Sequence, residues 1–308
     1  MPKKVDMFVS VGIPTLGREA VLVDTIKVVL AQDYKKFEII VADQTTNHPI
    51  EFLKEVRALA RANNQLRYYL IKPDNLPASR NFIASRAKGE LILFIDDDVK
   101  LKSDFINQHV VAHRNHPEVA VVAGRIEQKN LPLSPYPLYF DKCGLPQGTF
   151  NCPSSNSAAM LPGGNHSLSP EVIKKVGGYH TAYKKNAVRE ESDMGHRLIK
   201  DGFQIYYSAE AGLIHLSVPS GGSRVHKPQF DNLRFYMNDL LFMLRTVGTP
   251  YLPLAMFRRL RIYSGGSGLI SLRRFKRAGL FFIGLIGAVW LLIFEQGNFA
   301  AKEVKQIK

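Results

Sequence analysis

Three adjacent aspartates end an apolar run in the segment LILFIDDDVK, residues 91–100. Neighbouring carboxylates repel one another, so near an apolar interior they need a cation, hydrogen-bond donors or full solvation. Side chains alternate along an extended strand, which places Asp96 and Asp98 on one side and Asp97 on the other. Two carboxylates that face one cleft form a site for a hard cation such as Mg²⁺ or Mn²⁺. The alternative is a solvated acidic turn that caps the next helix.

A second acidic cluster, Glu190, Glu191 and Asp193, opens a segment with helical spacing. Acidic residues in a first helical turn are favoured by the helix dipole, and this structural role accounts for at least one of the three. A carboxylate held at such a position can also accept the proton of an attacking hydroxyl group. The cluster is therefore a candidate general base.

Histidines and glycines near the end of the strand-like segment LIHL suggest a third part of the site. His215 ends that segment, and Gly221, Gly222 and Arg224 follow it. This loop could close over phosphate groups as a cationic lid. By contrast, the helically spaced histidines at 109, 113 and 116 have no acidic partner motif, and we expect a solvated helix face there.

The elements that must position these residues alternate between strand and helix patterns. This alternation predicts an α/β fold with a mostly parallel sheet flanked by helices. Strands are expected near 6–13, 37–42, 67–72, 90–95, 118–123 and 203–207, and helices near 19–31, 50–63, 77–88, 103–115, 170–176, 191–201 and 230–246. Residues 126–160, rich in Pro, Ser and Asn, are expected to be irregular.

Polar residues follow three of the predicted strands. In an open α/β sheet, ligands bind at the carboxyl ends of the strands. The first strand is followed by Pro14, Thr15 and Arg18, the second by Asp43, and the fourth by the aspartate triplet. These three strand ends predict one nucleotide-sized site at a single edge of the sheet.

Length and composition exclude several classes of protein. A chain of 308 residues that is 45% hydrophobic and 22% charged can bury a large core and is not disordered. Cys143 and Cys152 are too few for a disulfide framework, and we expect free thiols. The N-terminus lacks the apolar run of a secretory signal, so the bulk of the chain is expected in the cytoplasm.

The formal charge of +14 is concentrated near the C-terminus. Residues 211–277 carry 11 Lys and Arg against 2 acids, and residues 278–294 are an uncharged apolar run. A basic stretch beside an apolar helix predicts contact with the anionic cytoplasmic face of a membrane, either peripheral or as a single span through 278–294. A buried core helix is the alternative. The aromatic residues are not interleaved with the basic ones, so no nucleic-acid partner is expected.

The motifs VSVGIPTLGR, FEIIVADQ, NLPASRN, LFIDDDV, LPGGNHSLSPEVIKKVGGY, REESDMGHRLIKDGF and LIHL follow one another over about residues 7–217. In this order they resemble the family 2 glycosyltransferases of GT-A fold. The resemblance implies a Rossmann-like nucleotide-binding half and an acceptor-binding half. It also implies a nucleotide-diphosphate sugar donor and a Mn²⁺ or Mg²⁺ cofactor.

The resemblance gives the candidate residues their roles. Asp43 matches the aspartate that contacts the nucleotide base in this family, and Asp96 matches the aspartate that approaches the ribose. The whole nucleotide-sugar set is Pro14, Thr15, Arg18, Asp43, Arg80, Asn81, Asp96, Asp97 and Arg224. The metal ligands are Asp98 and His215, and the acceptor-side set is Gly163, Gly164, Asn165 and Asp193. Glu191 stands where the family has an aspartate as general base, and Glu190 is the alternative.

The sequence thus predicts an inverting, metal-dependent glycosyltransferase that acts on a glycan or lipid-linked acceptor at the cytoplasmic membrane face. Residues 1–228 are expected to form the GT-A catalytic domain, and residues 229–308 a helical, membrane-associated region. One alternative is a nucleotidyltransferase on a related sheet, although PTLGRE lacks the lysine of its usual phosphate loop. The other is a membrane-tethered protein that binds nucleotide sugars without catalysis. The sugar and the oligomeric state are left open.

Overall fold

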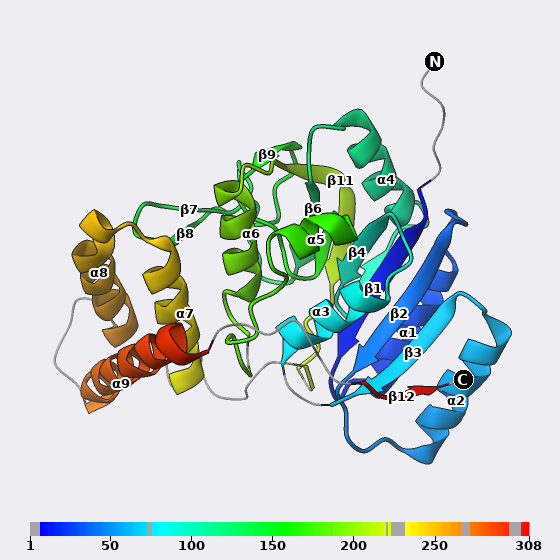
Figure 1. Ribbon diagram of the computed structural model, residues 1–308, viewed down its shortest axis with the longest axis horizontal. Helices are drawn as coiled ribbons and strands as arrows, with labels where there is room; N and C mark the ends of the chain where they lie inside the picture. Colours follow the sequence, from blue (N-terminus) through cyan, green and yellow to red (C-terminus); the bar gives the residue numbers. More distant parts are fainter. Residues whose placement is uncertain are drawn as a thin grey trace.

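The computed structural model has a central sheet with helices on both faces (Figure 1). It describes residues 7–72, 75–185, 187–219, 221–222, 232–265, 272–295 and 303–307. The predicted α/β architecture with a mostly parallel central sheet is confirmed.

The main sheet runs in the order β12-β3-β2-β1-β4-β10-β6-β11-β5, and β9 pairs with β11. Its strands are β1 Val9–Thr15, β2 Phe37–Asp43, β3 Leu66–Ile71, β4 Leu91–Ile95, β5 Val99–Leu101, β6 Val121–Gln128, β9 Asn156–Ala158, β10 Asn165–Leu168, β11 Ile205–His215 and β12 Glu303–Ile307. A separate pair is formed by β7 Tyr139–Phe140 and β8 Pro146–Gln147.

The helices are α1 Glu19–Leu30, α2 Ile50–Ala62, α3 Leu76–Arg86, α4 Phe105–Asn115, α5 Pro170–Lys175, α6 Glu190–Lys200, α7 Leu233–Thr246, α8 Leu252–Ser264 and α9 Leu272–Phe294, with a 3-10 turn at Thr249–Tyr251. Helices α1, α2 and α4 pack on one face of the sheet, and α3, α5 and α6 on the other. Strand β2 is buried on both sides, since Ile39 faces the first group and Ile40 the second. Burial on both sides explains why residues 39–42 of this strand are all apolar.

Parallel pairing brings the predicted strand ends to one edge. Strand β1 pairs in parallel with β2 and β4, and its last residue, Thr15, lies beside Asp43 at the end of β2. The antiparallel strand β10 lies between β4 and β6. The sequence pattern did not predict β10 as a strand, because its four residues are shorter than a recognisable alternation.

Helices α7, α8 and α9 form a third apolar cluster, which also takes in Cys143 and Tyr183 (Figure 1). Both cysteines are buried free thiols, as expected. Beyond α9 the chain returns to the main sheet, where β12 pairs antiparallel with β3. Strand β12, near the end of the region 229–308, therefore belongs to the sheet that was expected to lie within the catalytic domain, residues 1–228. That division into two domains stays a prediction.

The expectation of a solvated histidine face on α4 is wrong for two of the three residues. His109 is buried and contacts Ser167 and Asn165 through its two ring nitrogens, at 2.9 Å each. His113 is also buried, with Nε2 3.0 Å from the Ser167 hydroxyl. Burial lowers the pKa of His109 to about 3 and that of His113 to about 4, so both are neutral polar links between α4 and β10.

Candidate active site

The aspartate triplet follows β4, and its side chains point in two directions, although Arg18 contacts both Asp97 and Asp98. Asp97 turns toward β1, where its carboxylate accepts hydrogen bonds from the Thr15 hydroxyl at 2.6 Å and the Arg18 guanidinium at 2.8 Å. Burial raises the pKa of Asp97 to about 6, although Arg18 and Thr15 oppose the shift. Asp97 therefore joins the ends of β1 and β4 and holds Arg18 in place.

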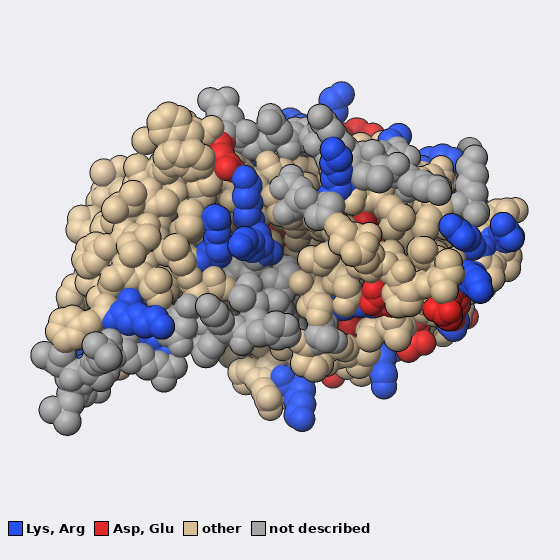
Figure 2. All heavy atoms as spheres, turned by 90° about the horizontal axis from the view of Figure 1, so that it is seen from below, with Lys and Arg blue, Asp and Glu red and all other residues tan. Residues whose placement is uncertain are grey.

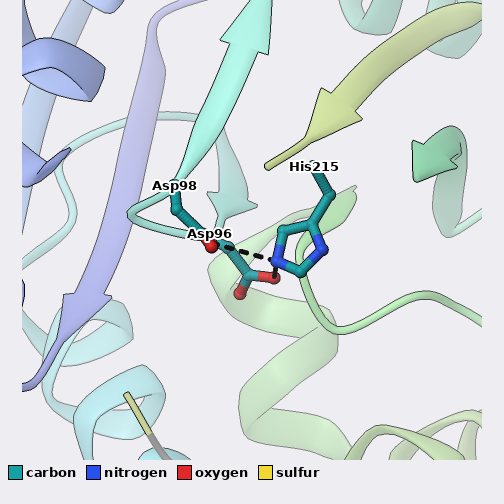
Figure 3. Close-up of side chains that lie close together, drawn as sticks. All are labelled: Asp96, Asp98 and His215. Carbon is teal, nitrogen blue, oxygen red and sulfur yellow. Dashed lines mark ion pairs between the residues drawn. The ribbon is translucent and has the colours of Figure 1, made fainter. Parts of the chain in front are cut away.

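Asp96 and Asp98 turn the other way, toward His215 at the end of β11 (Figure 3). His215 Nε2 lies 3.0 Å from Asp98 Oδ1 and 3.5 Å from Asp96 Oδ2. One ligand atom from each residue falls within 4.8 Å of the other two. The side chains of Asp96 and Asp98 thus point to one side and that of Asp97 to the other, as the sequence predicts.

Interactions behind these three side chains hold them in position. His215 Nδ1 lies 2.8 Å from the amide oxygen of Gln128, an arrangement that directs the opposite ring nitrogen at the carboxylates. The Val218 N–H donates to Asp98 Oδ2 at 2.9 Å, and Arg18 lies 2.9 Å from Asp98 Oδ1. Burial by itself would raise the pKa of Asp98. The contacts with His215, Val218 and Arg18 outweigh this effect and hold the pKa below its usual range. Two carboxylates and an imidazole fit a divalent cation such as Mn²⁺.

The second acidic cluster begins α6 on the other side of the same hollow. Glu190 is buried and forms an ion pair with the buried Arg80, whose Nη2 donates to the Gly163 carbonyl at 2.9 Å. Glu191 is less buried and lines the cavity. Burial raises the pKa of Glu191, and the nearby Arg80 and Arg189 only partly offset this shift. A carboxylate with a raised pKa that reaches the cavity suits a general base, whereas Glu190 is occupied by Arg80.

A cavity of about 640 Å³ joins the aspartate triplet, His215 and the start of α6. Its wall includes most of the residues that the sequence proposed: Pro14, Thr15, Arg18, Arg80, Asp96, Asp97, Asp98, Gly163, Gly164, Glu190, Glu191 and His215. Residues from β1, β4, β11, α3 and α6 thus meet at one place, as the strand-end rule predicts.

Gly164 lies directly against the Asp96 side chain. A Cβ atom added to it would stand 2.2 Å from Asp96 Oδ2, and one added to Gly163 would stand 2.9 Å from Arg80 Nη2. The two glycines therefore make room for side chains of this protein. Their predicted contact with an acceptor stays a prediction.

Two of the predicted nucleotide-binding residues do not line this cavity. Asp43 is buried, accepts hydrogen bonds from the Tyr68 hydroxyl and the Thr45 N–H, and lies 3.0 Å from His48 Nε2. Asn81 is buried and exchanges two hydrogen bonds of 2.8 Å with the backbone of Tyr179. Both side chains therefore fix local structure here, and the neighbouring Gln44 lines the cavity in place of Asp43.

Two of the predicted acceptor-side residues are likewise engaged inside the protein. The Asn165 amide donates to the carbonyls of Arg125 and Ala211 at 2.8 Å each, which ties β10 to β6 and to β11. Asp193 is buried and pairs with Arg197 and Arg245, at 2.7 and 2.6 Å. The predicted contact of these two side chains with an acceptor stays a prediction. Arg224 lies outside the described residues.

Four polar residues on the cavity wall were not predicted from the sequence: Gln44, Asn75, Gln128 and Lys185. Gln128 ends β6, so the strand-end rule finds it only if that strand is extended beyond the predicted end at 123. Lys185 lies in the turn before α6 and has a left-handed backbone, with φ 60°. No periodic pattern marks such a turn.

Comparison with known proteins identifies the family. Residues 10–176, more than half of the chain, match the model of the family described as glycosyl transferase family 2. The chain belongs to this family. It therefore carries a glycosyltransferase domain, in agreement with the resemblance of its motifs.

Curated relatives of this glycosyltransferase domain are partial and distant. An uncharacterised glycosyltransferase of Rickettsia conorii is 27% identical over 180 residues, which are 55% of this chain and 28% of that protein. The O-antigen biosynthesis protein RfbC of Myxococcus xanthus is 24% identical over 67% of this chain and 17% of its own length. A GalNAc(5)-diNAcBac-PP-undecaprenol beta-1,3-glucosyltransferase of Campylobacter jejuni is 31% identical over 33% of this chain and 32% of its own. The chain spans less than a third of each of these relatives.

Solved glycosyltransferase structures share the fold. The mannosyltransferase PcManGT from Pyrobaculum calidifontis, in complex with GDP-Man and Mn²⁺, is 13% identical with a TM-score of 0.56 over 94% of this chain and 88% of that one. GalNAc-T7 with UDP, GalNAc and Mn²⁺ is 13% identical with a TM-score of 0.67 over 94% of this chain and 58% of that one. These likenesses confirm the expected GT-A type fold.

Proposed function

We propose that this protein is an inverting glycosyltransferase that moves a sugar from a nucleotide-diphosphate donor to a hydroxyl group of a glycan or lipid-linked acceptor. The observation that carries the proposal is one cavity with two different acidic groups on its wall. The cluster of Asp96, Asp98 and His215 has the chemistry of a cation site, and Glu191 has that of a base.

The residues of the chain divide the work of the transfer. Asp96, Asp98 and His215 would hold Mn²⁺ or Mg²⁺, which when bound would neutralise the charge of a leaving diphosphate. Thr15 and Arg18, at the end of β1, would face the donor. Glu191 accepts the proton of the acceptor hydroxyl group while the oxygen of that hydroxyl group forms a bond to the anomeric carbon of the sugar. The bond from that carbon to the diphosphate oxygen then breaks on the opposite face, which inverts the configuration.

Two observations support a proposal for the acceptor and for the place where the enzyme works. The Campylobacter jejuni relative is named for an undecaprenol-linked substrate. Helix α9 has a stretch of 21 residues, Arg274–Phe294, that is long and apolar enough to cross a membrane. We infer that the acceptor is carried by lipid or lies near it. The enzyme would then work at the cytoplasmic face of the membrane, with the anionic lipid surface as a partner.

The deciding experiment is turnover with a panel of nucleotide sugars in the presence of Mn²⁺ or Mg²⁺. The purified protein should release a free nucleoside diphosphate from at least one donor, and chelation of the metal should stop the release. Release of inorganic pyrophosphate from a nucleoside triphosphate would instead indicate a nucleotidyltransferase. Donor binding without any release would indicate a binding protein.

Asp98→Asn tests the metal assignment. The variant should lose turnover while its circular dichroism spectrum and melting temperature stay close to those of the wild type. Asp201→Asn, at an exposed position after α6, is the matched control and should keep full activity. Wild-type turnover by purified Asp98→Asn would refute the assignment.

A further inference from the structure

Helix α9 has an apolar surface on both sides. One side is buried, with Phe281, Gly284, Ala288 and Leu291 turned toward α7 and α8. The opposite side is exposed at helical spacing, with Phe275, Ile286 and Phe294 exposed by 66%, 72% and 66%. A helix on the surface of a soluble protein carries polar residues on its outer side. Since residues 278–294 include no charged residue, the outer side of α9 needs another explanation.

The buried side attaches α9 closely to the rest of the protein. A Cβ atom added to Gly284 would lie 2.6 Å from Cβ of Tyr236, and one added to Gly287 would lie 2.6 Å from Cε of Met237. Helix α9 therefore packs with its backbone directly on α7. At its C-terminal end, Glu295 forms an ion pair of 2.8 Å with Lys184. Both the middle and the end of α9 are fixed to the body that carries the cavity.

The return of the chain to the sheet restricts how α9 can meet a membrane. Glu303 begins β12, which pairs with β3 in the main sheet. The eight steps from Glu295 to Glu303 reach at most about 29 Å when fully extended. A bilayer has a hydrocarbon core of ~30 Å and is ~40–45 Å thick with its headgroups. An extended backbone also cannot recross lipid, because its polar groups would lack partners. A crossing by α9 is therefore incompatible with the pairing of β12.

We propose that α9 lies in the plane of the membrane surface and does not cross it. Its outer side, with Phe275, Phe282, Ile286, Trp290 and Ile293, enters the boundary between headgroups and acyl chains, while its inner side stays on α7. Both ends of α9 remain on the side of the active site. This arrangement refines the membrane contact of the proposed function, on which it rests.

Charge favours a lipid surface over a second copy of the chain as the occupant. Residues 258–277, which run from α8 into the first turns of α9, include seven basic residues and no acid, so two copies brought together there would repel. An anionic lipid surface attracts the same residues. In the view from below, the lobe formed by α7 to α9 is mostly uncharged, with Lys and Arg at its border (Figure 2).

The geometry also places the active site beside the membrane. Lys184 contacts the end of α9, and the next residue, Lys185, lines the cavity. A hydroxyl group on a lipid-linked acceptor would approach the cavity from the plane in which α9 lies.

Topology labelling distinguishes an in-plane helix from a crossing one. In a Cys143→Ala/Cys152→Ala background, single cysteines are introduced as Lys276→Cys and Glu295→Cys near the two ends of α9. Lys88→Cys, at an exposed position before β4, marks the side of the catalytic body. Sealed right-side-out and inside-out vesicles from cells that make the full protein are treated with an impermeant maleimide. All three cysteines should react from the same side. Reaction of the two α9 positions from opposite sides would overturn the proposal.

A cross-link tests the return of the chain directly. Gln306 pairs with Tyr69 across β12 and β3. The double variant Tyr69→Cys/Gln306→Cys, oxidised in the same membranes, should form a disulfide that mass spectrometry of the digest detects. If Tyr69→Cys lowers the yield of folded protein, the labelling pattern above still decides the topology. A folded double variant that forms no disulfide would count against the in-plane arrangement.

Vesicle binding identifies what covers the outer side. The purified double variant Phe282→Glu/Ile286→Glu should bind vesicles of phosphatidylcholine with phosphatidylglycerol at least about tenfold more weakly than the wild type. Leu133→Glu changes an equally exposed apolar residue far from α9 in the sequence and should bind normally. Equal binding by all three proteins, or loss of a dimer without any change in vesicle binding, would overturn the proposal. These readouts do not depend on sugar transfer, so a failed transfer assay leaves them unaffected.

Discussion

At the scale of single residues, the distinction between Glu190 and Glu191 rests on their partners. Glu190 neutralises the buried Arg80, whereas Glu191 reaches the cavity with a raised pKa. Glu191→Gln should therefore lower kcat by about 10²–10⁴-fold, while donor binding in a thermal-shift assay persists. Glu190→Gln should act differently, because it leaves the Arg80 guanidinium buried without its carboxylate and lowers stability. Full activity in Glu191→Gln would exclude it as the base.

The raised pKa of Glu191 also predicts the pH dependence of the reaction. Below its pKa the carboxyl group is protonated and cannot accept a proton from the acceptor, so the rate falls as the pH falls. Because burial raises this pKa, the acidic limb of kcat/KM should lie above the range of an ordinary glutamate. Glu191→Asp should keep such a limb with a lower rate. If kcat/KM stays constant as the pH falls to the usual pKa of a glutamate, Glu191 is not the general base.

Gln128 positions His215, and its removal should affect metal binding more than chemistry. Without the Gln128 contact, Nδ1 keeps only the longer 3.2 Å contact with the Ser217 hydroxyl, and the imidazole is held less firmly toward Asp96 and Asp98. Gln128→Leu should weaken Mn²⁺ affinity by about 10–100-fold, as measured by calorimetry, while kcat at saturating Mn²⁺ changes less. Gln204→Leu, at an exposed position before β11, is the control. Equal losses of kcat and metal affinity would mean that Gln128 does more than orient the histidine.

At the scale of elements, a buried charge network connects α6 to the C-terminal helices. Asp239 on α7 is fully buried and contacts Arg189 at 2.6 Å, Arg259 at 2.7 Å and the Tyr263 hydroxyl at 2.5 Å. Arg189 directly precedes α6, which carries Glu190 and Glu191. The C-terminal helices therefore support the position of the catalytic cluster.

Removing the central acid of this network should be costly. Asp239→Ala leaves the buried Arg259 with an uncompensated charge and should lower the free energy of unfolding by about 3–5 kcal/mol, measured in urea. Lys27→Ala breaks an exposed pair with Glu55 and should change stability by no more than about 1 kcal/mol. If the two variants unfold at the same urea concentration, the network does not stabilise the fold.

The sequence predicted those elements whose apolar pattern is long and regular. The strands at 37–42 and 67–72 and the first four helices were placed within a few residues, because the strands are rich in buried apolar residues and the helices bury the side that faces the sheet. The short β10 and the return of β12 to β3 depend on contacts between distant segments, which no local pattern records. The site followed the same rule. Asp98, which follows β4, and His215, which ends β11, both line the cavity, whereas Asp43 and Asp193 contact Tyr68 and Arg245 inside the protein. The roles of these residues stay predictions.

At the scale of the whole molecule, the basic charge and the apolar helix should contribute separately to membrane binding. The net charge of +14 attracts an anionic surface, and salt screens this attraction, since the Debye length falls to about 8 Å at 0.15 M. Burial of the outer side of α9 is an apolar contribution that salt does not weaken. Binding to vesicles that contain phosphatidylglycerol should therefore decrease as salt is raised and then level off. Binding to pure phosphatidylcholine should be weaker from the start and almost independent of salt. Complete release from both kinds of vesicle at high salt would show that charge alone holds the protein to the membrane and that α9 does not enter it.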